Sequence, residues 1–151
     1  AVKAAMTGHL VFSTLHTNDA AGAAVRLLDM GIDPYLITST VRAFVAQRLV
    51  RVICPHCKQD YESQGRRFYR GQGCHACHQT GYLGRVAIYE FLLLARPIQD
   101  LILQRVSSAA IRDRAVAQGM TTLANDGWEK VAQGITTAEE VLRVTAMPEE
   151  S

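Results

Sequence analysis

The sequence has no apolar run long enough to cross a lipid bilayer, which takes about 20 residues as a helix. Its densest apolar stretch covers residues 91–95 and is ended by Arg96 and Pro97. No secretory signal peptide opens the chain, because the first apolar run, residues 10–15, is short and lacks a cleavage site of small residues. We therefore expect a cytoplasmic chain.

The sequence also has little excess of charge of either sign. Sixteen Lys and Arg face fourteen Asp and Glu, for a net charge of +2, whereas nucleic-acid-binding domains usually carry a clear basic excess. The 48% of hydrophobic and 20% of charged residues are typical of a globular protein and exclude intrinsic disorder. The 151 residues suffice for one domain with a small appendage, and we expect no nucleic acid as a partner.

A phosphate loop of the pattern G-x-x-x-x-G-K-[ST] is absent from the sequence. On its own, the chain is therefore not expected to hold a nucleoside triphosphate in the manner of a P-loop. The first residue is Ala1 rather than Met, and the sequence begins as if within a helix. We expect a fragment of a longer protein.

Four cysteines are present, and they form two C-x-x-C pairs, Cys54 with Cys57 and Cys74 with Cys77. The pattern C-x2-C-x16-C-x2-C falls within the range typical of a tetrahedral zinc site. Four sulfur ligands leave no open position for water, so the zinc site is predicted to be structural rather than catalytic. Free thiols and disulfides are the alternatives, although disulfides are less common in a chain without an export signal.

Histidines and arginines surround the cysteine pairs. Three histidines are interpreted as solvent-facing residues rather than metal ligands: His56, His75 and His78. Between the pairs, an exposed and mobile loop is expected over residues 64–73. The arginines of this loop are predicted to be solvated, with lipid headgroups or an inner-membrane partner as the alternative: Arg66, Arg67 and Arg70.

The first third of the chain predicts a strand, a polar loop and two helices. Residues 10–15 are apolar and β-prone, as in a strand buried on both faces, and the polar residues 16–19 follow. A helix is expected from residue 20 to residue 30, with Asn18 or Asp19 as its N-cap and Gly31 at its end. A second helix is expected to begin near Pro34, with a buried stripe of Ile37, Val41, Phe44 and Val45. Because ligands of open α/β sheets bind beyond the carboxyl ends of strands, we interpret this third as the end of a larger α/β domain.

The rest of the chain predicts one or two strands and then helices. The strands are expected over residues 85–94, with one side formed by Val86, Ile88 and Glu90. Pro97 opens a helix whose inward residues are Ile98, Leu101 and Ile102, and another helix spans residues 108–118 and ends at Gly119. A third helix has an apolar face that would make Trp128 a core residue: Ala124, Trp128, Val131, Ala132 and Ile135. A capping box of Thr137 and Glu140 opens a short terminal helix.

Several ordered motifs resemble those of one protein superfamily. Residues 7–19 (TGHLVFSTLHTND), called the histidine box below, resemble the segment of that name in secretion ATPases. Four further segments are similar to type II secretion and type IV pilus assembly ATPases: residues 47–51 (QRLVR), 54–58 (CPHCK), 81–85 (GYLGR) and 139–145 (EEVLRVT). The resemblance covers essentially the whole chain. Pilus retraction ATPases resemble it less, because they share the histidine box but lack the tetracysteine module.

The resemblance implies a hexameric motor that hydrolyses ATP with Mg²⁺ at the cytoplasmic face of a bacterial inner membrane. Such a motor drives pseudopilus assembly for type II secretion, or type IV pilus assembly, through partner proteins of the inner-membrane platform. The implied fold class is α/β: the end of a RecA-like P-loop ATPase domain (1–53), a tetracysteine zinc module (54–82), a returning strand (83–95) and a helical subdomain (96–151). The phosphate loop, catalytic glutamate and acidic magnesium-binding box would precede Ala1, so this chain alone is expected to be inactive.

The resemblance also suggests the residues of a nucleotide site. His16 matches the second histidine of the box and is the predicted catalytic residue, contacting a γ-phosphate or the attacking water; a helix-capping role is the alternative. Arg85 and Arg48 are predicted to bind nucleotide, because a guanidinium group can stabilise phosphate charge, with surface ion pairs as the alternative. His9 would lie at the opposite end of the strand from His16, which favours structural support, but the family keeps it as a nucleotide-binding candidate.

The alternative function is a non-enzymatic zinc-ribbon module that binds nucleic acid or protein, because C-x2-C pairs are common in such modules. The small net charge argues against it, as does the lack of aromatic residues interleaved with basic ones. Steeply salt-dependent binding to DNA or RNA would support it.

Overall fold

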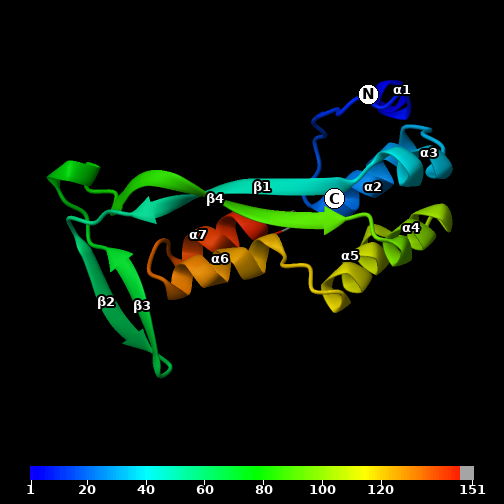
Figure 1. Ribbon diagram of the computed structural model, residues 1–151. Coiled ribbons are helices and arrows are strands. Elements are labelled where there is room, and N and C mark those ends of the chain that lie inside the picture. Colours follow the sequence, from blue (N-terminus) through cyan, green and yellow to red (C-terminus); the bar gives the residue numbers. More distant parts are fainter. Residues whose placement is uncertain (147–151) are drawn as a thin grey trace. The chain divides into compact units, whose positions relative to one another are not determined.

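The computed structural model describes residues 1–146 (Figure 1). They form two compact units, each built from separate parts of the chain: residues 1–46 with 90–121, and residues 47–89 with the described residues from 122 onward. The chain leaves the first unit inside strand β1 (Ala43–Ile53) and returns to it inside strand β4 (Tyr82–Leu93). These two strands pair with each other.

The first unit is mainly helical. Its helices are α1 (Val2–Met6), α2 (Ala20–Asp29), α3 (Pro34–Thr40), α4 (Arg96–Leu103) and α5 (Ser108–Ala117). Helix α5 contacts both α2 and α4, and α3 contacts α4. Small and aliphatic side chains fill the core, among them Ala24, Ile37, Leu92, Ile98, Ile102 and Ile111. None of the helices among residues 1–146 is both long and apolar enough to span a membrane.

Most helix ends of the first unit agree with the sequence prediction. Asp19 is the N-cap of α2, and its carboxylate accepts a hydrogen bond from the Gly22 N–H at 2.7 Å. Gly31 has φ +80° directly after the end of α2, a conformation that favours glycine. Pro97 lies in the first turn of α4, and the inward positions Ile98 and Ile102 are buried. These local predictions are confirmed.

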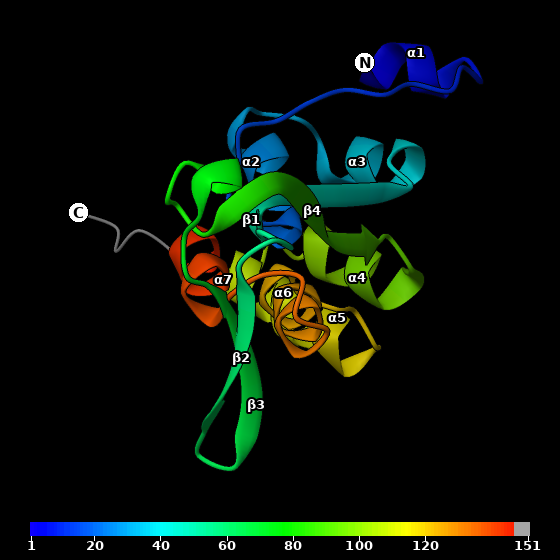
Figure 2. The same ribbon diagram turned by 90° about the vertical axis from the view of Figure 1, so that its left-hand side faces the viewer.

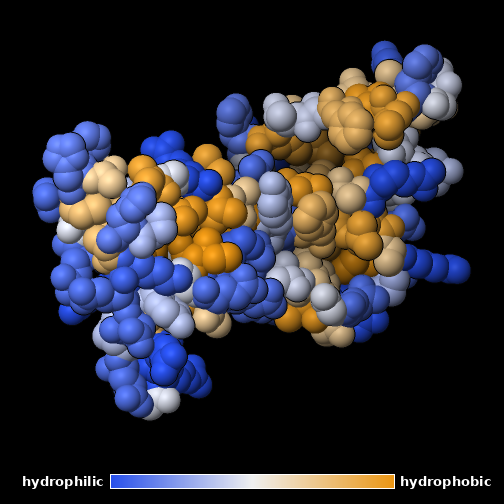
Figure 3. All heavy atoms as spheres, turned by 60° about the vertical axis from the view of Figure 1, so that its left-hand side comes forward, coloured by the Kyte–Doolittle hydropathy of each residue, from blue (hydrophilic) through white to orange (hydrophobic). Residues whose placement is uncertain are grey.

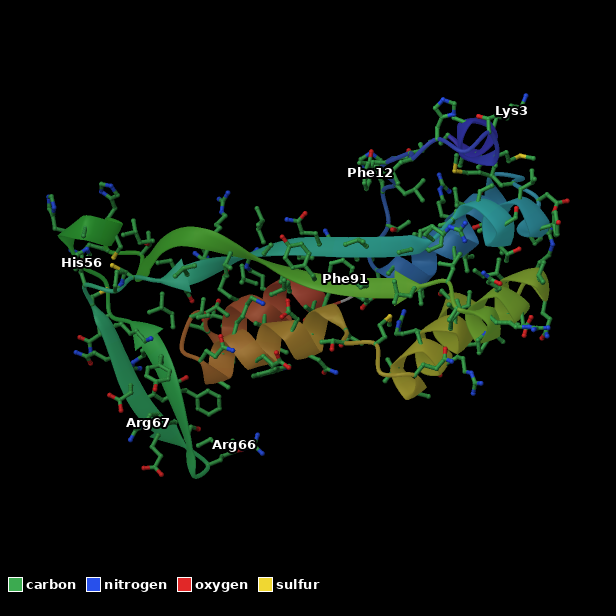
Figure 4. The ribbon with its side chains drawn as sticks, in the orientation of Figure 1. Lys3, Phe12, His56, Arg66, Arg67 and Phe91 are labelled. Carbon is green, nitrogen blue, oxygen red and sulfur yellow. The ribbon has the colours of Figure 1, made fainter. Side chains whose placement is uncertain are left out.

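The strand predicted at residues 10–15 is not formed. The segment between α1 and α2 is extended but has no regular secondary structure, and Phe12 lies on it (Figure 4). Leu10 and Phe12 are 84% and 88% exposed, so the expectation of a strand buried on both faces was wrong for this structure. A strand needs a neighbouring strand for its backbone hydrogen bonds, and residues 1–146 provide none for this segment.

The second predicted helix is shorter than expected. Helix α3 ends at Thr40, and the chain then becomes β1. Phe44 is buried in that strand while Val45 is 54% exposed, because successive strand residues point to opposite faces. The predicted helical stripe of Ile37, Val41, Phe44 and Val45 was therefore wrong beyond Ile37. The strand predicted at residues 85–94 is confirmed by β4, in which Ile88 and Glu90 are buried.

The second unit contains a hairpin, the cysteines and two helices. Its further elements are β2 (Lys58–Ser63), β3 (Arg66–Gly71), the 3-10 helix η1 (His75–Cys77), α6 (Leu123–Ala132) and α7 (Ala138–Thr145). Strands β2 and β3 lie side by side in Figures 1 and 2, antiparallel, with Lys58 opposite Gly71 and Ser63 opposite Arg66. In Figure 3 the end of this hairpin is coloured almost entirely as hydrophilic.

The hairpin corrects the mobile loop predicted for residues 64–73. Only Gln64 and Gly65 form the turn, with φ values of 52° and 72°, and residues 66–71 are strand β3. Two positive φ angles suit a two-residue hairpin turn, which the sequence signals less clearly with Gln-Gly than with Asn-Gly. Across the hairpin, the rings of Tyr61 and Phe68 stack with centroids 5.8 Å apart.

The face of α6 that packs against α7 differs from the face predicted to be buried. The buried residues of α6 are Leu123, Gly127 and Val131, whereas Trp128 is 40% exposed, so its assignment to the core was wrong. A Cβ atom added to Gly127 would lie only 2.6 Å from Cγ1 of Val141 on α7. Because glycine lets the two helices approach, the buried stripe runs through Gly127 and leaves Trp128 outside it.

Candidate functional site

The four cysteines come together in the second unit. Their sulfur atoms all lie within 4.8 Å of one another, and they are the one such group of potential metal ligands among the described residues. The Sγ atoms of Cys54 and Cys74 are 3.9 Å apart, as are those of Cys57 and Cys77. Four tetrahedral sulfurs that each lie about 2.3 Å from a zinc ion are about 3.8 Å apart. The cluster therefore has the donor type and spacing of a tetrahedral zinc site.

Short turns position the two cysteine pairs. In each pair the second cysteine donates its backbone N–H to the carbonyl oxygen of the first, at 3.3 Å for Cys57 and 3.2 Å for Cys77. Cys54 follows β1 and Cys57 precedes β2, while Cys74 caps η1 and Cys77 is its last residue. The two C-x-x-C turns thus bring the ends of β1 and of the hairpin to one point.

Backbone N–H groups also point at one of the sulfurs. Cys74 and Gly81 each donate an N–H to Sγ of Cys77 at 3.2 Å. Burial raises the pKa of the Cys77 thiol, but these two backbone donors and the neighbouring thiols outweigh it and lower the pKa to about 6. Burial and the surrounding thiols raise the pKa of Cys57 to about 11, against the lowering effect of a backbone donor. The amides thus favour negative sulfur at one corner of the cluster, as metal thiolates require.

The histidines near the cluster are exposed, as the sequence predicted. His56, His75 and His78 all face solvent, and the four-cysteine group includes none of them. Figure 4 labels His56 beside the sulfur atoms of the cluster. His78 has φ 50°, which ends η1 in the left-handed conformation.

The other predicted site residues lie outside the cluster. His9 and His16 belong to the first unit, and both are exposed; Nδ1 of His9 is 3.0 Å from Oγ1 of Thr7. Arg48, which is half-buried in β1, and Arg85, which is exposed in β4, belong to the second unit. The catalytic and nucleotide-binding roles of these four residues stay predictions.

Sequence reasoning missed a polar network at the start of α2, close to His16. The buried Glu90 accepts a hydrogen bond from the Ala20 N–H at 2.9 Å, and Asp19 forms an ion pair with Arg112 at 2.5 Å. The one signal in the sequence was an acidic residue within the apolar strand of residues 85–94.

A second polar network, also missed, surrounds Glu140 in α7. Its side chain is fully buried and accepts hydrogen bonds from the Arg51 N–H at 3.0 Å and from the guanidinium groups of Arg51 and Arg143. Burial raises the pKa of Glu140, but the bonds from Arg143 and Arg51 outweigh it and hold the pKa well below its usual range. The Arg51 guanidinium lies 4.1 Å from the centre of the Tyr82 ring, whose hydroxyl is 2.8 Å from Oγ1 of Thr137.

The second network also modifies the predicted capping box. Thr137 caps α7 as expected, because its Oγ1 accepts the Glu140 N–H at 3.3 Å. The Glu140 carboxylate is directed instead to Arg51 and Arg143, so it links α7 to β1.

The arginines of the hairpin are exposed, and Figure 4 places Arg66 and Arg67 at its tip. Arg67 lies 3.6 Å from the Asp60 carboxylate on the facing strand, and Arg70 lies 5.3 Å from the centre of the Tyr61 ring. These contacts follow from cross-strand pairing and indicate a solvated face.

The chain is similar to a family of bacterial proteins. Residues 1–143 match the family described as T2SSE, Type II/IV secretion system protein. The Type II secretion system ATPase E of Vibrio cholerae is 44% identical over 158 residues, which cover 96% of this chain and 31% of that protein. The Type II secretion system protein HxcR of Pseudomonas aeruginosa is 47% identical over 145 residues, or 96% of this chain and 30% of that protein.

A relative named for pilus assembly is also similar to this chain. The Type IV pilus assembly ATPase PilB of Thermus thermophilus is 45% identical over 160 residues, covering 96% of this chain and 18% of that protein. The chain thus spans less than a third of the length of these three relatives.

Two solved structures share the fold. The Legionella pneumophila ATPase DotB superposes with a TM-score of 0.64 and 23% identity, over 96% of this chain and 34% of that chain. The pilus retraction motor PilT with bound ADP superposes with a TM-score of 0.66 and 24% identity, over 97% of this chain and 35% of that chain. At these identities the similarity concerns the fold alone, which is α/β in class.

Proposed function

Because the chain belongs to the type II/IV secretion system protein family, we propose that it is the C-terminal part of an ATPase that powers type II secretion or type IV pilus assembly. The carrying observation is identity of 44–47% along 96% of the chain to relatives named for both systems. The complete ATPase would be a RecA-like hexamer at the cytoplasmic face of the inner membrane, acting on platform proteins there. The domain boundaries at residues 53, 82 and 95 belong to this proposal.

Two histidines of the histidine box and two arginines outside it would contribute to the nucleotide site. His16 would donate a ring N–H to a γ-phosphate oxygen, or orient the attacking water, once ATP and Mg²⁺ are bound by the rest of the ATPase. Its exposure leaves the imidazole accessible to such a ligand. Arg85 and Arg48 would offset phosphate charge with their guanidinium groups, and His9 would support the box or contact nucleotide.

The tetracysteine cluster would hold a zinc ion through Cys54, Cys57, Cys74 and Cys77. Four sulfur ligands close the coordination sphere, so the metal supplies folding free energy rather than a reactive water. Sulfur–sulfur distances of 3.7 and 3.9 Å and the N–H groups directed at Cys77 support this assignment.

A chimera tests the proposed function. The matching segment of the Vibrio cholerae type II secretion ATPase E is replaced by these 151 residues, and ATP hydrolysis is measured. The same exchange with the segment of HxcR is the matched control. We expect both chimeras to hydrolyse ATP, and the 151-residue chain alone to be inactive.

Single substitutions in the chimera then test the assigned residues. His16→Ala should lower kcat on the order of 10²-fold, the usual contribution of a group that transfers a proton or positions the nucleophile. His75→Ala, in an exposed histidine outside the box, should leave kcat unchanged. An inactive chimera beside an active HxcR exchange would contradict the proposed function, and a normal kcat for His16→Ala would contradict the role of His16 alone.

A further inference from the structure

Two carboxylates bind the first turn of α2, immediately after the histidine box. Glu90 accepts the Ala20 N–H at 2.9 Å, and Asp19 accepts the Gly22 N–H at 2.7 Å. The first N–H groups of a helix have no partner within the helix, and negative charge there is stabilised by the helix dipole. Two separate parts of the chain therefore fix the point at which the histidine box enters α2.

Further contacts restrain the last residues of the box. The Thr17 hydroxyl donates to the Asp19 carbonyl oxygen at 3.2 Å, and Arg112 of α5 donates to the second carboxylate oxygen of Asp19. A Cβ atom on Gly22 would lie 2.8 Å from Oδ1 of Asp19, so glycine makes room for this carboxylate. The backbone after His16 is thus held from α5 and from β4.

Glu90 occupies a position that packing alone would give to an apolar residue. Ile88 and Leu92 lie on the same side of β4 and are buried, and Glu90 between them is 3% exposed. Burying a carboxylate costs several kcal/mol unless hydrogen bonds compensate it. The carboxylate here is directed at the backbone of Ala20, only four positions after His16.

We propose that Glu90 is a positioning residue for His16. By holding the Ala20 N–H, it fixes the C-terminal end of the histidine box, whose preceding residues 9–17 have no regular secondary structure. The contact fixes the position at which this extended segment joins α2, and so limits where the His16 imidazole can lie. This inference rests on the catalytic role of His16 proposed above.

A double-mutant cycle in the active chimera tests this inference. Glu90→Ala removes the acceptor and should lower kcat about tenfold or more with little change in KM for ATP, since small misplacements of a reacting group cost up to 10²-fold. Glu90→Gln keeps an oxygen that accepts the Ala20 N–H and should restore most of kcat. In the His16→Ala background, Glu90→Ala should cause no further loss, because its effect passes through His16.

Thermal unfolding of each variant separates positioning from folding, and Arg112→Ala is compared with Arg114→Ala on the same helix. Because Arg112 binds Asp19, Arg112→Ala should lower kcat, whereas Arg114→Ala, at an exposed position, should leave kcat unchanged. Losses from Glu90→Ala and His16→Ala that multiply would overturn the inference, as would equal loss in Glu90→Gln and Glu90→Ala. A normal kcat for His16→Ala would instead remove the premise and identify the proposed role of His16 as the failure.

Discussion

The tetracysteine cluster and the histidine box are both recognisable in the sequence, but they acquire order in different ways. Turns within residues 54–81 bring the four free cysteines together, and these turns supply both the sulfurs and the N–H groups around them. Residues 9–17 of the histidine box have no regular secondary structure. Leu10 and Phe12 are exposed, and its end is held by Glu90 and Arg112 from remote positions.

The comparison teaches that a motif predicts geometry only when its partners are near in sequence. C-x2-C spacing constrains two sulfurs to one turn, so the cluster follows from the motif. The histidine box is defined by its residue types, but the groups that bond to the backbone at its end belong to remote parts of the chain. The cysteine motif therefore led to a correct arrangement, whereas the histidine box led to a strand that the structure does not contain.

The largest expected effect comes from removing a cysteine. Cys54→Ser should abolish binding of a single zinc ion per chain and destabilise the second unit, because metal binding to such modules contributes on the order of 10 kcal/mol. Metal content by mass spectrometry and amide hydrogen exchange would check this. His56→Ser, beside the cluster but exposed, is the control and should keep the metal. Equal zinc content in Cys54→Ser and the parent chain would contradict the assignment and remove the contrast with the histidine box.

A smaller loss of stability is expected on substituting Glu140, which bonds to Arg51, 89 residues away in the chain. Glu140→Ala removes a buried carboxylate that accepts hydrogen bonds from Arg51 and Arg143; because both arginines are about half exposed and can be solvated, the unit should lose about 1.5–3 kcal/mol. Urea unfolding at pH 7 measures the loss. Glu139→Ala on the exposed side of the same helix is the matched control. A loss no larger than that of the control would contradict the stabilising role of this network.

Glu140 also gives the second unit a pH dependence. Its pKa is lower in the folded than in the unfolded chain, so its contribution to stability is complete above the unfolded pKa of about 4.3 and is lost as pH falls below it toward the folded pKa. Between pH 7 and pH 3, the free energy of unfolding should therefore fall more steeply with decreasing pH in the parent chain than in Glu140→Gln. Parallel curves would contradict this sign.

Side chains with local partners were predictable from the sequence, and those with remote partners were not. Asp19 as the cap of α2, Thr137 as the cap of α7 and the turn within each C-x-x-C pair follow from neighbours a few residues away, whereas the two pairs meet across 20 residues. The buried roles of Glu90 and Glu140 depend on groups 70 and 89 residues distant, which no local pattern specifies.

Errors of secondary structure have the same origin. Val45 was assigned to a helix because its spacing from Ile37 and Val41 fits 3.6 residues per turn, yet pairing of β1 with β4 overrides that spacing. Trp128 was assigned to the core by its apolar character, while the contact that orients α6 is made through Gly127 and Val141. Short apolar runs leave helix and strand ambiguous until the partner is known.

A still smaller loss of stability is expected from a substitution where helices α6 and α7 pack together. Gly127→Ala would normally favour a helix, but the added Cβ would lie 2.6 Å from Val141, and such overpacking costs about 1–3 kcal/mol. Asn125→Ala, at an exposed position of α6, should change stability little. Thermal unfolding of both variants would check the difference, and a stabilised Gly127→Ala would contradict the packing described here.

The smallest effect is expected in the histidine box itself. Phe12→Ser should change the stability of the 151-residue chain by no more than about 0.5 kcal/mol, because the ring is 88% exposed. Urea unfolding provides the measurement, with Phe44→Ser in buried β1 as the contrasting variant. A loss at Phe12 as large as that at Phe44 would mean that the box is packed and that the comparison drawn above fails.

The division of each unit into separate stretches of chain also affects the order of events during synthesis. The bonds Ala20–Glu90, Asp19–Arg112 and Arg51–Glu140 span 70, 93 and 89 residues, so the first unit must wait for residue 112 and the second for residue 140 to leave the ribosome. Limited proteolysis of nascent chains stalled once residue 115 has left the ribosome would reveal whether the first unit has closed by then. Contacts of such separation form slowly, whereas all four sulfurs are available once residue 77 has emerged. Ligation of the zinc ion proposed above would therefore precede these long-range contacts, and each unit would be completed only after β1 and β4 have left the ribosome.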